Sequence, residues 1–301
     1  MSDKVSVSSS FQTLIARIQP LDSEYRQLDS HSGTIKSRLL KQFDVKAFSM
    51  IGSHKKGTAI RRTSDVDFIV IFSRDDVRWG GQYIDSRTLI NKVRMWLSGL
   101  FQQTTIRRDQ QALVLNYSGG NFAVDVVPGF FEGMDTNGQV KYPVYSIPDG
   151  KGSWLQTSPE MHTRYINQEN ERSTYQLTRA IQLIKYWKFT RESQIPLSSF
   201  HLELLLSSES VCVGVKSYAQ CLADAFDILA QRQCRPLRDP IGISGLIQST
   251  NTELQRLDLY RSVCLARDRA FRAIEAEEKG NIIQAKRIWG VIFHNRFPIN
   301  G

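Results

Sequence analysis

Two aspartates one residue apart, Asp65 and Asp67, stand at the start of an apolar run that continues to Phe72. Successive side chains of a strand alternate between its two faces, so both carboxylates project from one face of this segment. Oxygen ligands held in this way suit a hard divalent cation such as Mg²⁺, which combines a few protein carboxylates with water and substrate phosphates. The pair therefore indicates metal-assisted chemistry on a phosphate-bearing substrate.

A third carboxylate, Asp125, interrupts the apolar segment 122–127. A charge in such a segment is costly unless it is paired, bound to a metal or placed at a strand end. Three carboxylates on adjacent strands can hold two metal ions about 3.5 to 4 Å apart, one activating an attacking hydroxyl and the other stabilising the leaving phosphate. Phosphoryl and nucleotidyl transfer need this neutralisation of charge more than they need covalent catalysis.

The dipeptide Gly52-Ser53 precedes the aspartate pair by twelve residues and follows a predicted strand. Free backbone N–H groups and a hydroxyl at the start of a helix are suited to holding a triphosphate, and glycine allows close approach. A D-x-D pair alone is weak evidence, because solvated acids at a strand end are the more common explanation. Together with Gly52-Ser53 and Asp125, the pattern favours a catalytic site.

Two kinds of pattern divide the chain near residue 160. Short β-rich runs come first, with an expected hairpin turn at Ser118-Gly119-Gly120, and helical spacing of apolar residues follows. The expected strands are 47–51, 65–72, 105–108, 113–117 and 122–127, and the expected helices are 11–18, 23–41, 86–101, 177–187, 200–207, 216–233, 252–278 and 282–293. We therefore expect an α/β (α+β) fold with a sheet lobe over 1–160, a helical lobe over 161–301 and a ligand-binding cleft between them.

Composition narrows the class of protein. The chain has 301 residues, 41% of them hydrophobic, and a net charge of +9, which is typical of a globular protein that attracts phosphates. The charge alone does not show whether the protein binds nucleotides, binds nucleic acid or merely has a solvated basic surface. The four cysteines lack zinc-ligand spacing, so no zinc is expected. The sequence has neither a membrane span of about 20 apolar residues nor a secretory signal, so a cytoplasmic location without membrane association is expected.

These motifs resemble the polymerase-β-like nucleotidyltransferases, whose signature is G-S, a short spacer, D-x-D on a strand and a third Asp on a later strand. More narrowly, the chain is similar to the CD-NTases, the bacterial relatives of cyclic GMP-AMP synthase and oligoadenylate synthase that make cyclic oligonucleotide messengers in CBASS antiphage defence. The matching blocks are 52–67, Val124 to Pro128, Tyr145 to Pro148 with Trp154, Ile184 to Lys188, Ser199 to Leu204 and Trp289 to Pro298.

The resemblance implies roles for particular residues. Asp65, Asp67 and Asp125 would bind two Mg²⁺ or Mn²⁺ ions, with Asp125 also placed to take the proton of the attacking ribose hydroxyl. Gly52 and Ser53 would hold the donor triphosphate.

Two residues of the second half match family positions that reach the donor phosphates, Lys185 and Ser199. Lys185 borders the apolar stripe of its predicted helix, so a lysine that extends to the surface is the alternative. Phe200 or Tyr145 could stack on a base, although an aromatic residue in such a setting is more often part of the core.

The expected activity is the joining of ribonucleoside triphosphates (ATP, GTP, UTP or CTP) into a cyclic di- or trinucleotide. The expected partners are effector and ancillary proteins of a CBASS operon, a nucleic-acid activator, and a conjugation partner for Gly301. Two alternatives remain at this stage: a template-independent nucleotidyltransferase that acts on RNA or protein, and an inactive basic RNA-binding homologue. His54 and His294 depart from the usual family pattern, but neither removes a metal ligand.

Overall fold

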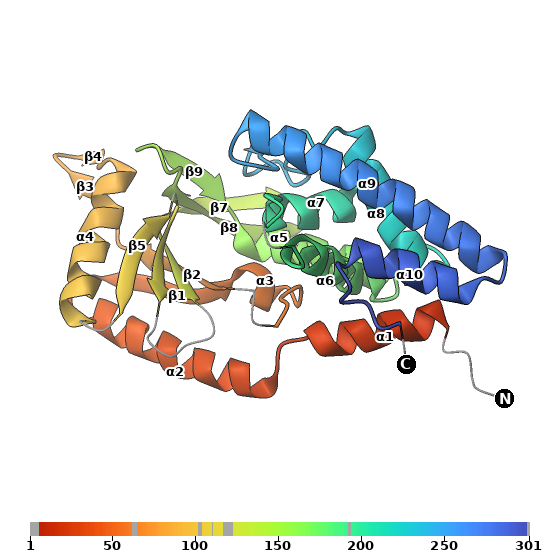
Figure 1. Ribbon diagram of the computed structural model, residues 1–301. Coiled ribbons are helices and arrows are strands. Elements are labelled where there is room, and N and C mark those ends of the chain that lie inside the picture. Colours follow the sequence, from red (N-terminus) through yellow and green to blue (C-terminus); the bar gives the residue numbers. More distant parts are fainter. Residues whose placement is uncertain are drawn as a thin grey trace. The chain divides into compact units, whose positions relative to one another are not determined.

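The computed structural model describes residues 6–61, 65–101, 104–109, 111–116, 123–191 and 194–299, with the backbone alone described for 25–31. The chain divides into two compact units (Figure 1). Residues Pro20–Arg164 form one, the sheet unit. Met1–Gln19 and Tyr165–Gly301 form the other, the helical unit, so the first helix belongs with the C-terminal half. The predicted cleft between sheet and helices stays a prediction.

The sheet unit is built on a mixed seven-stranded sheet. Its main path runs in the order β1-β2-β7-β6-β5, and β8 and β9 extend it from β7. Only β2 and β7 pair in parallel, while the other neighbours are antiparallel. Its elements are α2 (Asp22–Leu39), β1 (Val45–Ile51), α3 (Gly52–Lys55), β2 (Val66–Phe72), β3 (Arg78–Trp79), β4 (Gln82–Tyr83), α4 (Ser86–Leu100), β5 (Thr105–Asp109), β6 (Ala112–Asn116), β7 (Ala123–Asn137), β8 (Val140–Pro148) and β9 (Trp154–Thr157).

The two faces of this sheet carry different side chains because each strand alternates. Val66, Phe68 and Val70 of β2 point into the main core, which α2 and α4 complete. Ile69 and Ile71 point to the opposite face and pack in a smaller apolar cluster. Asp67 has the parity of this second group, so it lies on the face opposite α2 and α4, where the alternation of the sequence predicts it.

The helical unit consists of helices around several large buried side chains. Trp187 and Trp289 are fully buried, and Phe11 of the first helix packs edge-on against Trp289 with ring centroids 4.9 Å apart. The last two helices, α9 and α10, lie side by side (Figure 1). The elements of this unit are α1 (Val7–Ile18), α6 (Gln176–Phe189), α7 (Ser199–Ser208), α8 (Tyr218–Gln231), β10 (Leu237–Arg238), β11 (Leu246–Ile247), α9 (Glu253–Glu278) and α10 (Ile282–Ile292), while α5 (Pro159–Arg172) crosses the boundary between the units.

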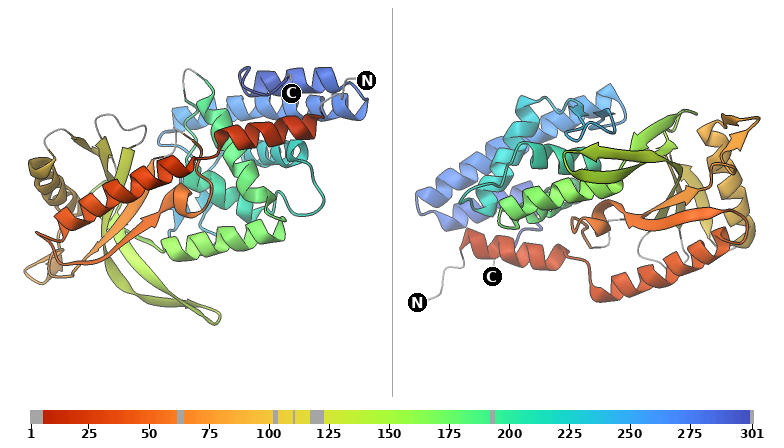
Figure 2. Two further views of the ribbon diagram at one scale, coloured as in Figure 1. Left: turned by 90° about the horizontal axis from the view of Figure 1, so that it is seen from below. Right: turned by 180° about the vertical axis from the view of Figure 1, so that it is seen from behind.

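The predicted α/β fold class is confirmed, and each predicted strand and helix is present with bounds shifted by a few residues. The sequence patterns did not predict β3, β4, β8, β9, α5, β10 and β11, nor the extension of β7 to Asn137. This extension and β8 form a ribbon that reaches beyond the rest of the sheet (Figure 2). The predicted turn at Ser118-Gly119-Gly120 lies outside the described residues. No helix in the described part of the chain is long and apolar enough to cross a membrane.

Candidate active site

The three candidate metal ligands come from two adjacent strands of the sheet unit. Asp67 of β2 lies directly opposite Asp125 of β7, and residues paired in this way present their side chains on the same face. Asp65 directly precedes β2, and its Oδ1 accepts a hydrogen bond of 3.3 Å from the backbone N–H of Ala123. The structure therefore brings all three carboxylates together at the N-terminal ends of β2 and β7.

Of the three carboxylates, that of Asp125 has the surroundings that best fit a cation ligand. Its Oδ1 is buried and has no hydrogen-bond partner among the described residues. Burial raises its pKa to about 8, and the negative charges of Asp67, Asp65 and Asp109 act in the same direction. Burial also raises the pKa of Asp65, although the bond from Ala123 and the charge of Arg107 oppose it.

A divalent cation would remove this strain, because it supplies both the missing partner of Oδ1 and the missing positive charge. The residues therefore fit the metal ions that the sequence predicts. Among the described residues, no group of three or more acidic, histidine or cysteine side chains is arranged as a ready metal site.

Gly52 is required at its position by the approach of Asp67. A Cβ built on Gly52 would lie 1.9 Å from Oδ2 of Asp67, and the backbone of Gly52 has φ +67°, a conformation that favours glycine. Gly52 begins the short helix α3 directly after β1, and Ile51 at the end of β1 pairs with Asp67. The glycine thus lets the Gly52-Ser53 turn lie against Asp67, one of the candidate metal ligands.

Ser53 is half-buried and helps to fix the loop that follows α3. Its carbonyl accepts a hydrogen bond of 2.9 Å from the backbone N–H of Thr58. The structure therefore places both residues of the predicted phosphate-binding turn beside the aspartates.

Lys185 and Ser199 lie on neighbouring helices of the helical unit, but Lys185 is engaged elsewhere. Only 2% of its side chain is exposed, and its Nζ lies 2.5 Å from Oε1 of Glu203, which is equally buried. Lys188, one helical turn further along α6, donates to Oγ of Ser199 at 3.4 Å and to the carbonyl oxygen of Leu197 at 2.6 Å. Burial lowers the pKa of Lys188 to about 8, with a further contribution from the charge of Lys185.

The phosphate-binding role of Lys185 stays a prediction, and the structure adds Lys188 as a second lysine beside Ser199. Sequence reasoning missed Lys188, although the spacing of three residues from Lys185 is the available signal.

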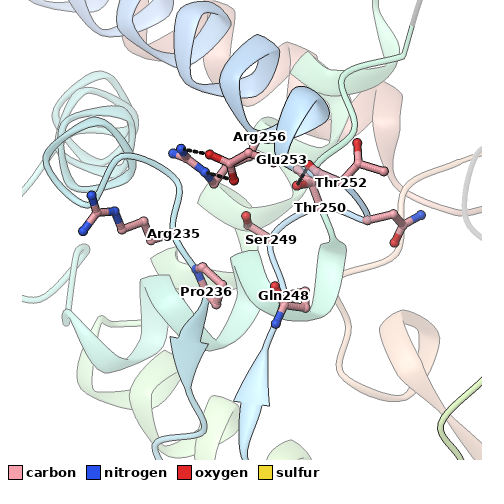
Figure 3. A pocket seen from close by; sticks show the side chains of 9 residues that line it. Arg235, Pro236, Gln248, Ser249, Thr250, Thr252, Glu253 and Arg256 are labelled. Carbon is pink, nitrogen blue, oxygen red and sulfur yellow. Dashed lines mark hydrogen bonds and ion pairs between the residues drawn. The ribbon is translucent and has the colours of Figure 1, made fainter. Parts of the chain in front are cut away.

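A cavity of about 320 Å³ lies at the start of α9 in the helical unit (Figure 3). Its polar groups largely satisfy one another: Arg256 pairs with Glu253 and donates to the carbonyl oxygen of Gln233, while the hydroxyl of Thr250 donates to the carbonyl oxygen of Thr252. Such a cavity has no set of carboxylates that could hold catalytic metals. It is not the candidate active site.

The sheet unit combines a mixed sheet with a Gly-Ser turn after β1, an aspartate pair at the start of β2 and a third aspartate on β7. This combination defines a nucleotidyltransferase of the polymerase-β-like fold. Residues 5–170 match the family model of the SMODS domain, the Second Messenger Oligonucleotide or Dinucleotide Synthetase domain. The chain belongs to this family. The resemblance to the CD-NTases is thereby confirmed, and the chain is a nucleotidyltransferase.

Two curated relatives carry the names of synthases of cyclic nucleotides. A probable cyclic nucleotide synthase of Bacillus cereus (strain VD146) is 25% identical over 334 residues, covering 97% of each chain. The cyclic AMP-AMP-AMP synthase of Escherichia coli (strain MS 115-1) is 25% identical over 201 residues, covering 64% of this chain and 59% of the relative.

Solved structures have the same fold. The E. coli MS115-1 protein CdnC with ATP superimposes with a TM-score of 0.74 at 19% identity, covering 99% of this chain and 100% of CdnC. The complex of CdnC with HORMA-deltaN gives the same TM-score at 18% identity, with full coverage of both chains.

Proposed function

We propose that this chain is a cytoplasmic enzyme of CBASS antiviral defence that makes a cyclic di- or trinucleotide messenger from ribonucleoside triphosphates. The observation that carries this proposal is the placement of Asp67 opposite Asp125, with Asp65 beside them and an unpartnered buried oxygen on Asp125. The names of the two curated relatives support a cyclic product rather than a linear one, and one of them, a cyclic AMP-AMP-AMP synthase, supports an oligonucleotide.

Asp65, Asp67 and Asp125 would hold two Mg²⁺ or Mn²⁺ ions, which neutralise the charge that develops on the donor phosphates. In each transfer, a ribose hydroxyl oxygen of the acceptor bonds to the α-phosphorus of the donor. The bond from that phosphorus to the β-phosphate breaks, pyrophosphate leaves with the electron pair, and the hydroxyl proton passes to Asp125 and then to water.

The donor triphosphate would lie against the turn at Gly52 and Ser53, because this turn borders Asp67. Ser199 would contact the same phosphates together with a lysine of α6. Both Lys185 and Lys188 remain candidates, since the first is the family position and the second is the one that contacts Ser199.

We expect regulation by partner proteins. CdnC, which has the same fold, is known in complex with HORMA-deltaN, and this supports an ancillary protein as one partner. An effector protein that binds the product and a nucleic-acid activator are further proposals. Gly301, the proposed site of conjugation, lies outside the described residues.

The test is incubation of the purified chain with all four ribonucleoside triphosphates and Mg²⁺ or Mn²⁺, followed by phosphatase treatment and mass spectrometry. We expect a phosphatase-resistant cyclic mass that is absent from an Asp65→Asn/Asp67→Asn double variant with unchanged circular dichroism. Linear products or long tails would instead indicate a transferase that acts on RNA or protein. Binding of RNA without turnover, with an affinity that falls steeply with salt, would indicate an inactive RNA-binding homologue.

A further inference from the structure

One cation shares the row of the sheet that holds the catalytic aspartates. Arg107 of β5 pairs with Val114 of β6, Val114 pairs with Asp125, and Asp125 pairs with Asp67. Directly opposed residues present their side chains on the same face, so Arg107 projects on the aspartate face. The packing agrees with this parity, because the preceding residue, Ile106, packs into the core on the other face.

Arg107 has polar neighbours on this face. Thr105 lies two residues before it on β5 and pairs with Asn116 of β6, whose own partner on β7 is Ala123. Thr105, Arg107 and Asn116 are all exposed. We call these three residues the polar platform. Among the described positions of β2, β7, β6 and β5 on this face, Arg107 is the only basic residue.

The platform lies on the side of the aspartates away from the Gly52-Ser53 turn, the side left for an acceptor when the donor triphosphate lies at that turn. The Gly52-Ser53 turn follows β1, on one side of the aspartates, whereas β5 and β6 lie on the other side. Two strand spacings, about 10 Å, separate the backbone of Arg107 from that of Asp125. This is the scale of a nucleotide, so an acceptor whose ribose hydroxyl is at Asp125 can place its 5′-phosphates near Arg107.

The guanidinium of Arg107 is available for such a contact. Its ion pair with Asp109 has a separation of 3.7 Å, and 59% of the Arg107 side chain is exposed. An exposed pair of this length contributes little and exchanges readily for a phosphate, to which a guanidinium can donate two parallel hydrogen bonds.

We propose that Arg107 binds the 5′-phosphates of the acceptor nucleotide and, with Thr105 and Asn116, positions its ribose hydroxyl at Asp125. This inference rests on the proposed function, because it assigns the acceptor side of the same site. It predicts that the enzyme prefers a phosphorylated acceptor and that this preference depends on one side chain.

The test compares two acceptors with the same labelled donor triphosphate. The first acceptor is a nucleoside without phosphates, which serves only as an acceptor because it has no pyrophosphate to release. The second is the matching nucleoside triphosphate, which carries the 5′-phosphates that Arg107 would bind. In Arg107→Gln we expect KM for the triphosphate acceptor to rise about tenfold or more, as the loss of a charge-assisted hydrogen bond predicts. We expect no change in KM for the nucleoside acceptor or for the donor.

Arg108→Gln is the matched control. Arg108 is the next residue of β5, has the same charge, and donates to the carbonyl oxygen of Gly150 at 3.1 Å. It lies on the opposite face of the strand, so its substitution should leave the preference between acceptors unchanged. Thermal unfolding of both variants checks that β5 remains paired.

Three results would overturn the assignment. The Arg107→Gln enzyme could keep the parental preference for the triphosphate acceptor, lose activity equally with both acceptors, or change its choice of base. If the unmodified protein joins no nucleotides under any condition, the proposed function fails, and this inference fails with it. Product formation with an unchanged preference refutes the role of Arg107 alone.

Discussion

The substitution Gly52→Ala tests the link between the Gly-Ser turn and the metal site. The new Cβ would meet Oδ2 of Asp67 at 1.9 Å, and an ordinary contact of about 3.4 Å requires the carboxylate to retreat by about 1.5 Å. A displacement of about 1 Å at a catalytic centre can cost about 100-fold in rate. We therefore expect Gly52→Ala to lower kcat for nucleotide joining by at least about 100-fold.

The same substitution also has a cost for the backbone. A residue other than glycine at φ +67° costs about 1–2 kcal/mol. In a protein of this size, such a loss lowers Tm by only a few degrees. The fold should therefore persist while the activity is lost.

Gly57→Ala separates the two effects. Gly57 has φ +69°, close to the value for Gly52, but a Cβ built on it meets no atom within 4 Å. It should show the same small fall in Tm without the loss of rate. The assay is initial product formation with saturating triphosphates and Mg²⁺, alongside thermal unfolding. Equal losses of rate in both variants, or a Gly52→Ala enzyme with near-parental rate, would refute the reasoning.

Three further predictions concern buried charges. Burial raises the pKa of Asp125 from its ordinary value of 3.8 to about 8. Between these pH values the folded chain binds one more proton than the unfolded chain, so its unfolding free energy falls as the pH rises from 5 to 8. Asp125→Asn should remove this contribution in denaturant titrations without divalent metal, and an unchanged pH dependence would contradict the burial of the carboxylate. Lys185→Met removes one partner of a buried ion pair with Glu203, so it should lower the unfolding free energy by about 3–5 kcal/mol. Lys188→Met should mainly raise KM for the donor triphosphate if this lysine and Ser199 contact it. A stable Lys185→Met variant with a raised donor KM would return the phosphate-binding role to Lys185.

The chemistry of the site could be predicted from local patterns. Asp65 and Asp67 stand at the start of an apolar run, and Asp125 interrupts another, so each candidate ligand is visible within a few residues of sequence. The fold class follows for a similar reason, because strand alternation and helical spacing are local signals. The pairing of the strands is not local. Nothing near Asp67 shows that Asp125, 58 residues later, lies directly opposite it.

The elements missed by the sequence analysis are those whose stability comes from neighbours. The end of β7 is exposed and polar. Pro143 and Pro148 interrupt the strand pattern of β8, whose other residues are rich in Val and Tyr. The two strands form because they pair with each other over seven residue pairs, from Phe130 with Ser146 to Asn137 with Val140. The pair of Lys185 and Glu203 is a comparable case, since the packing of α6 against α7 brings together two charges 18 residues apart.

The register of the sheet, which the sequence leaves open, decides which charges face the metal site. Shifting β5 by one residue against β6 would turn Arg107 toward the core and bring Arg108 to the aspartate face. Burial of Ile106 in the core opposes that shift, because the same slip would expose this side chain. The apolar residues between the charged ones thus hold the register that places Arg107 in the row of Asp67 and Asp125. A polar substitution at Ile106 should therefore impair the preference between acceptors as well as the stability of the sheet, although Ile106 itself points away from the substrate.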